Sequence, residues 1–502
     1  IFGPSNPLVS GLLPQSIVDL TMSHCYNMPI IQGVLPSSLL TFALGDDFNQ
    51  PLAPSTLPQT LTKLTFGYNF NQPLQAYVLP QSLTDLTFGY QFNQLIVPGT
   101  LPRELRKLVF GHNYNLPLIG ATLDNNSSTQ RGSLPQSLTT LKFGNDFNQT
   151  LTPGTLPHKL LSVEFGSLFN QQVAPGTLPS SLKVLFFNTR FNQLVPAGSL
   201  PASLVHLRFG SNFNEQLEQG ALPHGLAKLE FGFYFNQTIT PFTFPQTLTN
   251  LRFGSKFDQL LTPGLLPASV KVLNFGNLFN SVIPMNSLPP HLLRVGFGTE
   301  FNRPLPPGTL PLSLTSLKFG RRFNQELGPN VLPPALQVLK VGCEFNQQTS
   351  HLPKTLRSIT VTNYRAHLSL VQQCYTYISR IKVSTTPQTN LSPTLSPSNG
   401  TIQSSPPTPS SPSPPIILSN PNPGQPLKLR ELYMYGYLKD LSEYQYIVGS
   451  LAKQLFIPNI YIYLDLNSDI FNYYCRIIDQ DVSLVLDEKQ SGGFISTNSV
   501  LQ

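Results

Sequence analysis

Residues 57–78 read Leu-Pro-Gln-Thr-Leu-Thr-Lys-Leu-Thr-Phe-Gly-Tyr-Asn-Phe-Asn-Gln-Pro-Leu-Gln-Ala-Tyr-Val, and most of the chain repeats this pattern. The copies begin with Leu-Pro, or once with Phe-Pro, at residues 13, 35, 57, 79, 101, 134, 156, 178, 200, 222, 244, 266, 288, 310, 332 and 352. The step is therefore 22 residues, except for one step of 33 and a last step of 20. A fixed period of this length is typical of stacked coils that bury their apolar faces against neighbouring coils. The sequence thus predicts one long β-rich solenoid.

The apolar residues of one copy predict a short strand. Leu61, Leu64 and Phe66 are apolar, and the last two alternate with a polar residue, which places them on one face of a strand. Pro58 cannot donate a ladder hydrogen bond, so it belongs before the strand. The step Leu-x-x-Leu-x-Phe resembles the strand of a leucine-rich repeat, and stacked copies would form a parallel sheet.

Two corners are predicted in each coil. Gly67 follows the strand, and thirteen of the first fifteen copies have Gly at this place, with Asn188 as one exception. Because Gly and Asn tolerate positive φ best, we expect a left-handed backbone there. Many copies end in Pro-Gly, as at Pro263 and Gly264, which predicts a type II turn at the second corner.

An aromatic residue and an amide lie between the two corners. The aromatic residue is Tyr26 and Tyr114 in two of the first fifteen copies and Phe in the others, and Asn follows it in all but one, where Asp258 replaces it. We predict that the rings stack as an inner spine, with each offset pair adding about 0.5–1.5 kcal/mol beyond its buried area. We also predict that the Asn side chains are buried and that their carbonyl oxygens accept hydrogen bonds from the backbone.

The motif Leu-Pro-x-Ser-Leu-x-x-Leu-x-Phe-Gly-x-x-Phe-Asn resembles the FNIP repeat, a relative of the leucine-rich repeat, from residue 13 to about residue 365. In this chain Gln mostly replaces the Ile of the eponymous tetrapeptide, as at Gln50, and the Asn lies two residues later than in an ordinary leucine-rich repeat. The resemblance implies an interaction scaffold without defined chemistry.

Composition predicts four regions. They are a solenoid over 1–365 with a polar insert loop at 120–133, a C-terminal cap of the solenoid at 366–383, a disordered Ser/Thr/Pro-rich linker at 384–426 and a small α+β module at 427–502. In the last region, apolar spacing predicts a helix over 440–456 and strands over 460–466, 473–478 and 482–486.

The composition of the chain argues against nucleic-acid and membrane partners and indicates a cellular location. Charged residues make up 11% of the chain, against roughly a quarter in a typical soluble protein, and the net charge is +7. This mild excess predicts no nucleic-acid partner, and the absence of a long apolar run predicts no membrane span. The four Cys residues show no pairing rhythm, which favours a reducing, cytoplasmic location. The chain starts at Ile1, and residues 2–8 look like a shortened earlier copy, so a preceding signal or domain is left open.

The exposed face of the predicted sheet is the candidate binding surface. It carries basic residues at Lys63, Lys107, Lys142, Arg208, Lys228, Arg252, Arg294, Lys318 and Lys340 and acidic residues at Asp19, Asp85, Glu164 and Glu230. Its second half is the more consistently basic. We predict that Arg208, Lys228, Arg252, Arg294, Lys318 and Lys340 bind a partner protein through an acidic segment. The competing interpretation is an ordinary solvated strand face.

An enzyme of the β-helix type is the first alternative class, since carbohydrate-active β-helix hydrolases and lyases have similar coil lengths. Such enzymes need several carboxylates on adjacent coils, whereas the acidic strand residues here are spread over many coils. Asp46 and Asp47 form the only adjacent acidic pair in the array, and the His residues, including His112, His206 and His224, show no metal-ligand spacing. The sequence therefore predicts no enzyme and no catalytic, cofactor-binding or metal-binding residue.

An extracellular adhesion or glycan-binding protein is the second alternative. Glycosylation sequons occur at Asn148 and Asn236. Both use the Asn of the repeat motif, so repetition explains them more simply than glycosylation does.

Overall fold

A computed structural model describes residues 7–120, 122–123, 130–347, 349 and 351–361, and the backbone of six further strands between residues 380 and 496. The chain forms two compact units, Ile1–Gly298 and Thr299–Gln502. This division falls inside the repeat array. Such a boundary is natural in a solenoid, because each coil contacts only its neighbours and a division can fall between any two coils.

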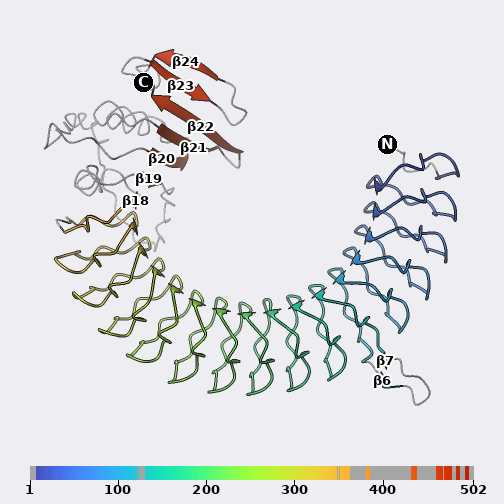
Figure 1. Ribbon diagram of the computed structural model, residues 1–502, viewed down its shortest axis with the longest axis horizontal. Coiled ribbons are helices and arrows are strands. Elements are labelled where there is room, and N and C mark those ends of the chain that lie inside the picture. Colours follow the sequence, from blue (N-terminus) through green and yellow to red (C-terminus); the bar gives the residue numbers. More distant parts are fainter. Residues whose placement is uncertain are drawn as a thin grey trace, which may run out of the picture. The chain divides into compact units, whose positions relative to one another are not determined.

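Each coil of the first unit contributes one three-residue strand to a parallel sheet. The strands are β1 (Asp19–Thr21), β2 (Thr41–Ala43), β3 (Lys63–Thr65), β4 (Asp85–Thr87), β5 (Lys107–Val109), β8 (Thr140–Lys142), β9 (Ser162–Glu164), β10 (Val184–Phe186), β11 (His206–Arg208), β12 (Lys228–Glu230), β13 (Asn250–Arg252), β14 (Val272–Asn274) and β15 (Arg294–Gly296). Neighbouring strands pair in register, so Lys63 faces Asp85 and equivalent positions form columns. Within this unit the strands line the concave side of an arc (Figure 1). The predicted solenoid of 22-residue coils is confirmed.

The long step between copies contains a small hairpin. Strands β6 (Thr122–Leu123) and β7 (Gln130–Arg131) pair antiparallel in the insert and project away from the stacked coils (Figure 1). The parallel sheet passes this insert without interruption, because β5 pairs directly with β8.

Two columns of stacked aromatic rings fill the core beside the buried Leu residues. Leu64 and Phe70 are fully buried, and Phe66 is 2% exposed. The ring centroids of Phe66 and Phe70 lie 3.9 Å apart within one coil, while Phe66 is 5.5 Å from Phe88 and Phe70 is 6.2 Å from Phe92 in the next coil. The predicted inner spine is therefore confirmed, but it is double.

Close packing of the coils favours the Gly that follows nearly every strand, although Asn188 stands at this place in one coil. A Cβ atom on Gly67 would lie 1.8 Å from the carbonyl oxygen of Gly45, and Gly67 is outside the left-handed region, so the predicted left-handed backbone at this corner is wrong. At the same place in its coil, the Asn188 amide donates a hydrogen bond of 2.6 Å to the carbonyl of Phe165. The second corner does have the predicted positive φ, with 86° at Gly264.

The Asn after each inner aromatic residue links neighbouring coils. The backbone N–H of Asn49 donates to Oδ1 of Asn27 at 2.9 Å, and the N–H of Asn280 donates to Oδ1 of Asp258 at 2.7 Å. The predicted acceptor role is confirmed. The predicted burial is wrong, because Asn27 and Asp258 are exposed and Asn49 is half-buried. The preceding ring points into the core, so the next side chain lies at the surface of the turn.

The second unit begins with the same kind of coil and ends in longer strands. Its strands are β16 (Ser316–Lys318), β17 (Val338–Lys340), β18 (Ser358–Val361), β19 (Arg380–Ser384), β20 (Glu431–Tyr437), β21 (Asn459–Leu466), β22 (Asp469–Ile477), β23 (Val482–Leu486) and β24 (Gly492–Ser496). Strands β16 to β21 pair in parallel, whereas β21 to β24 pair antiparallel.

The C-terminal predictions are only partly covered by the structure. Strands β21, β22 and β23 overlap the three strands expected from the sequence. The expected helix over 440–456 and nearly all of the expected linker over 384–426 lie outside the described residues, so the linker and the α+β module stay predictions. Among the residues that the structure describes, no helix is long and apolar enough to cross a membrane.

Candidate partner-binding face

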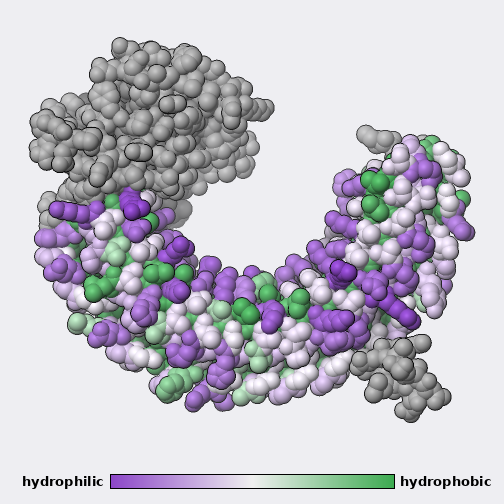
Figure 2. Space-filling view, in the orientation of Figure 1, coloured by the Kyte–Doolittle hydropathy of each residue, from purple (hydrophilic) through white to green (hydrophobic). Residues whose placement is uncertain are grey.

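The first and third residues of each strand point away from the core and form two columns. In β12, Lys228 and Glu230 flank Leu229, which is fully buried. Because the strands are in register, His206 lies beside Lys228, and Arg208 lies beside Glu230. We call these first-position and third-position columns together the strand face. Figure 2 shows mostly hydrophilic residues along the concave edge of the first unit, where this face lies.

The six residues predicted to bind a partner all lie on strand faces. Arg208, Arg252, Lys318 and Lys340 are third-position residues of β11, β13, β16 and β17, and Lys228 and Arg294 are first-position residues of β12 and β15. In the first unit, Arg208, Lys228 and Arg252 lie on three consecutive strands. Arg294 is separated from them by β14, whose outward residues are Val272 and Asn274. In the second unit, Lys318 and Lys340 are register partners on neighbouring strands.

Glu230 is the centre of the cluster on β11 to β13. Its Oε1 atom lies 2.6 Å from Nζ of Lys228 and 3.2 Å from Nε2 of His206. The side chains of Glu230 and His206 are only 18% and 20% exposed. This carboxylate therefore takes up the charge of Lys228 and interrupts the basic face that the sequence predicted.

The pKa values of the cluster follow from burial and from this ion pair. Burial raises the pKa of Glu230, but the hydrogen bond and charge of Lys228, together with His206, outweigh it and bring the pKa below its ordinary value. Burial and the charge of Lys228 lower the pKa of His206, and the hydrogen bond to Glu230 only partly opposes them. At neutral pH the cluster thus holds an ionised Glu230 beside a neutral His206.

Two guanidinium groups flank Glu230 in the third-position column. Arg208 and Arg252 are the register partners of Glu230 on either side. The guanidinium carbon of Arg208 lies 4.3 Å from the ring centroid of Phe186, which holds the planar group over the aromatic face. Within the described part of the chain, neither Arg208 nor Arg252 forms an ion pair with a carboxylate. Both groups are therefore available to an external anion.

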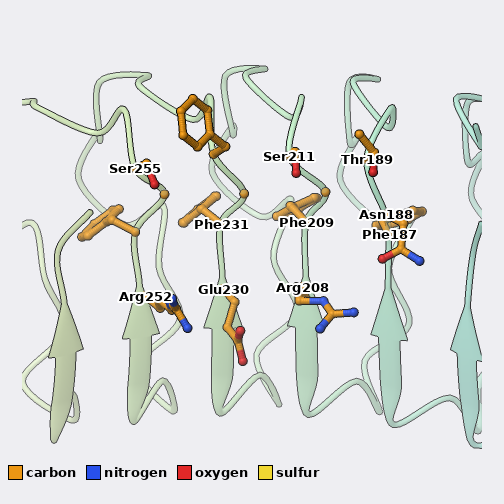
Figure 3. A pocket seen from close by; sticks show the side chains of 15 residues that line it. Phe187, Asn188, Thr189, Arg208, Phe209, Ser211, Glu230, Phe231, Arg252 and Ser255 are labelled. Carbon is orange, nitrogen blue, oxygen red and sulfur yellow. The ribbon is translucent and has the colours of Figure 1, made fainter. Parts of the chain in front are cut away.

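Arg208, Glu230 and Arg252 line one side of a hollow of about 480 Å3. Figure 3 shows Arg208, Glu230 and Arg252 projecting from three neighbouring strands below the hydroxyls of Ser211 and Ser255. The combination of guanidinium donors, one carboxylate and a rim of hydroxyls suits a charged, hydrogen-bonding segment better than an apolar one.

The signs of the charges alternate along the third-position column. Strands β8 to β13 carry Lys142, Glu164, Phe186, Arg208, Glu230 and Arg252 in this column. The first two residues form an ion pair of 3.2 Å across neighbouring strands. Glu230 instead pairs within its own strand and with His206, which leaves the flanking arginines unpaired. The sequence predicts that Glu230 lies on this face, but it does not predict its central role. The repeat period fixes the position of Glu230, whereas its pairing depends on side-chain conformations.

Among the residues that the structure describes, acidic groups away from this cluster do not gather into a second centre. The Asp46 carboxylate is 54% exposed and lies 2.7 Å from Nδ1 of His24, and this hydrogen bond lowers the pKa of Asp46. In the portion of the chain that the structure describes, no group of three or more His, Cys, Asp or Glu residues is placed to hold a metal ion.

Solved structures similar to the chain include a leucine-rich-repeat protein and an internalin. The chain is similar to CroV588, described as a novel circular leucine-rich-repeat protein, with 36% identity, a TM-score of 0.59 and coverage of 75% of this chain and 61% of that one. It is more distantly similar to an internalin (inlF) from Listeria monocytogenes, with 15% identity, a TM-score of 0.36 and coverage of 71% of this chain and 85% of that one.

Comparison with protein families agrees with the repeat analysis. The search of curated proteins gave no match. Profile matches to the FNIP Repeat family tile the array between residues 4 and 363 in successive, partly overlapping segments. These matches cover more than half of the chain and coincide with the coils, so the chain belongs to the FNIP repeat family.

Proposed function

We propose that the protein is a non-catalytic interaction scaffold, which binds an acidic segment of a partner protein on its strand face. Leucine-rich-repeat-like solenoids are typical of protein-interaction scaffolds, since their stacked coils present extended surfaces. The residues proposed to carry binding are Arg208, Arg252 and Arg294 in the first unit and Lys318 and Lys340 in the second, while Lys228 pairs with Glu230.

The observation that carries this proposal is the pair of unpaired arginines beside a satisfied carboxylate. Arg208 and Arg252 face the same hollow, while Glu230 is already held by Lys228 and His206. Guanidinium groups bind carboxylates through two parallel hydrogen bonds, and a charge-assisted bond is roughly twice as strong as a neutral one. A partner carboxylate is therefore the group that this surface accepts best.

A cytoplasmic location is part of the proposal. Cys25 is exposed and free in the structure. A surface thiol persists most readily in a reducing compartment. Alkylation of Cys25 in protein taken from its native cells tests this: a reduced thiol supports the proposal, and an oxidised thiol contradicts it.

Charge reversal on the strand face tests the binding proposal. The probes are two fluorescein-labelled twelve-residue peptides, each made of four Glu, four Ser and four Pro residues in different orders, and binding to the full chain is measured by fluorescence anisotropy. We expect Arg252→Glu, Arg294→Glu and Lys318→Glu together to weaken binding by tenfold or more. The matched control combines Lys159→Glu, Arg190→Glu and Arg303→Glu, which change the net charge equally at exposed positions off the strands.

The two triple variants separate a local site from a general charge effect. Loss of binding in the strand-face variant with retention in the control supports the proposal. Equal loss in both variants, or failure of the unaltered protein to bind either peptide, contradicts it.

A further inference from the structure

The spacing of the arginines on the strand face carries information about the shape of the partner. We propose that β11, β12 and β13 select a partner segment in the polyproline II conformation that has a carboxylate at every third residue. This inference rests on the proposed binding of acidic segments and adds the conformation and the spacing of the acidic residues.

The strands that carry the two arginines lie two strand spacings apart. Arg208 and Arg252 are separated by one intervening strand, and neighbouring strands lie about 4.8 Å apart, so two spacings span about 9.6 Å. A segment crossing the strands along the column must place its carboxylates at this interval. The polyproline II helix has three residues per turn and rises about 3.1 Å per residue, which puts residues i and i+3 on one edge about 9.3 Å apart. An extended β segment puts residues i and i+2 on one face only about 6.7 Å apart.

The middle of the site attracts no anion. Glu230 lies between the two arginines in the column, and its charge is compensated by Lys228 at 2.6 Å. A partner carboxylate placed over this ion pair gains little binding energy, whereas a carboxylate placed over either guanidinium group gains a charge-assisted hydrogen bond. A polyproline II segment directs its two intermediate side chains to its other edges, so it leaves the middle free of negative charge.

The backbone of such a segment also fits the polar lining. Polyproline II has no internal hydrogen bonds, so its N–H and C=O groups need outside partners. The rim of the hollow offers the hydroxyls of Ser211 and Ser255 (Figure 3). The guanidinium of Arg208 is held over Phe186, which reduces the freedom that it loses when a carboxylate binds.

The selectivity is tested with the two peptides of identical composition and charge. One is Ac-(Glu-Ser-Pro)4-amide, with acidic residues three apart, and the other is Ac-(Ser-Pro)4-(Glu)4-amide, with the acidic residues in a block. We expect the unaltered full chain to bind the spaced peptide about tenfold more tightly. Its Pro residues hold three successive i, i+3 pairs of Glu in the polyproline II conformation, whereas the block peptide offers one such pair in a segment without Pro. Arg208→Gln and Arg252→Gln should each remove this preference. The control Lys107→Gln changes the charge equally on the same face, in β5, and should preserve it.

Glu230→Gln provides the sharper variant. It releases Lys228 and leaves three cations, Arg208, Lys228 and Arg252, on neighbouring strands without a carboxylate among them, so we expect binding of the block peptide to strengthen and the preference to fall to about twofold or less. The matched control is Glu164→Gln, which releases Lys142 from an ion pair of 3.2 Å elsewhere on the same face and should keep the preference. Circular dichroism checks that all variants are folded.

The outcomes distinguish this inference from the proposed function. Tight binding of both peptides with equal affinity, or preference for the block peptide, overturns the spacing inference and leaves the acidic-segment proposal intact. A preference that persists in Arg208→Gln and Arg252→Gln also overturns it. Binding of neither peptide contradicts the proposed function itself.

Discussion

Replacing Gly232 with Ala tests the close packing of neighbouring coils. A Cβ atom at this position would lie 1.8 Å from the carbonyl oxygen of Gly210 and 2.7 Å from the Cα atom of Ser211. Both contacts are with backbone, so no flexible side chain can move aside. The coils would have to separate locally, against the hydrogen bond of 2.8 Å from the Tyr234 N–H to the Ser211 carbonyl.

The expected cost follows from this geometry. Overpacking a well-packed core costs about 1–3 kcal/mol of stability, and occasionally more. We expect Gly232→Ala to cost about 3 kcal/mol or more, because the added methyl group meets the backbone of the preceding coil. The matched control is Gly264→Ala, where φ is 86° and nothing lies within 4 Å of the added Cβ atom. Its cost is the left-handed strain alone, about 1–2 kcal/mol.

A third variant tests how Asn188 is accommodated. The Asn188 amide donates to the carbonyl of Phe165 at 2.6 Å. Asn carries the same Cβ atom as Ala, so both variants share the packing cost. We therefore expect Gly232→Asn to lose less stability than Gly232→Ala only through the equivalent hydrogen bond of its amide. Urea unfolding of the full chain, followed by far-ultraviolet circular dichroism, measures all three variants. If Gly232→Ala lost no more stability than Gly264→Ala, the packing explanation for the Gly column would be refuted.

Three further predictions concern the core and the cluster. Phe213→Ala should lower the free energy of unfolding by about 3–5 kcal/mol, because the ring is fully buried and its centroid lies 3.8 Å from that of Phe209; urea unfolding measures it, and a negligible loss contradicts the aromatic columns. Tyr114→Phe should raise the melting temperature, with a gain of about 1–2 kcal/mol, since the buried hydroxyl has no hydrogen-bond partner among the described residues; a lower melting temperature would show that this hydroxyl has a partner. The lowered pKa of His206 favours its neutral form in the folded state, so the stability that it contributes is present above its ordinary pKa of 6.5 and is lost as the pH falls below that value. Thermal unfolding between pH 7.5 and pH 5 should therefore show a flatter pH profile for His206→Gln than for the unaltered protein, and parallel profiles would contradict the assignment.

The period of the sequence determines the fold to an unusual degree. Columns arise wherever the same residue returns at the same place, so the alternation of Leu64 and Phe66 and the position of the inner Phe were enough to predict the strands and the core. The sequence does not predict the second aromatic column, because the alternation of Leu64 and Phe66 indicates only that Phe66 lies on the inner face of a strand. In the structure its ring packs against Phe70 at 3.9 Å, beyond the end of the strand.

Two predictions, the φ angle at Gly67 and the burial of the Asn column, are wrong because the sequence pattern does not separate two different structural causes. Gly is selected both where φ is positive and where backbones approach closely, so Gly67 and Gly264 look alike in the sequence although only the second has positive φ. The sequence predicts a buried Asn column, because an amide in every coil can pair with the backbone groups where the chain turns. The column instead requires an Oδ1 atom that accepts a hydrogen bond from the backbone of the next coil. Asn27 accepts this hydrogen bond at an exposed position.

The candidate site was predictable in position but not in detail. The register places Arg208, Glu230 and Arg252 side by side once the strands are known. Which cation pairs with Glu230 depends on side-chain conformations, and the choice of Lys228 over the flanking arginines is what leaves two free guanidinium groups.

Photo-crosslinking with mass spectrometry tests the central claim most directly, namely that an acidic segment binds on the strand face. The spaced acidic peptide, carrying a benzophenone group, is irradiated with the full chain, and the crosslinked residues are identified. We predict crosslinks to outward residues of β11, β12 and β13 that disappear in the presence of excess unlabelled peptide. Competed crosslinks confined to residues outside the strands, such as the row that contains Asn214 and Asn236, would contradict the account.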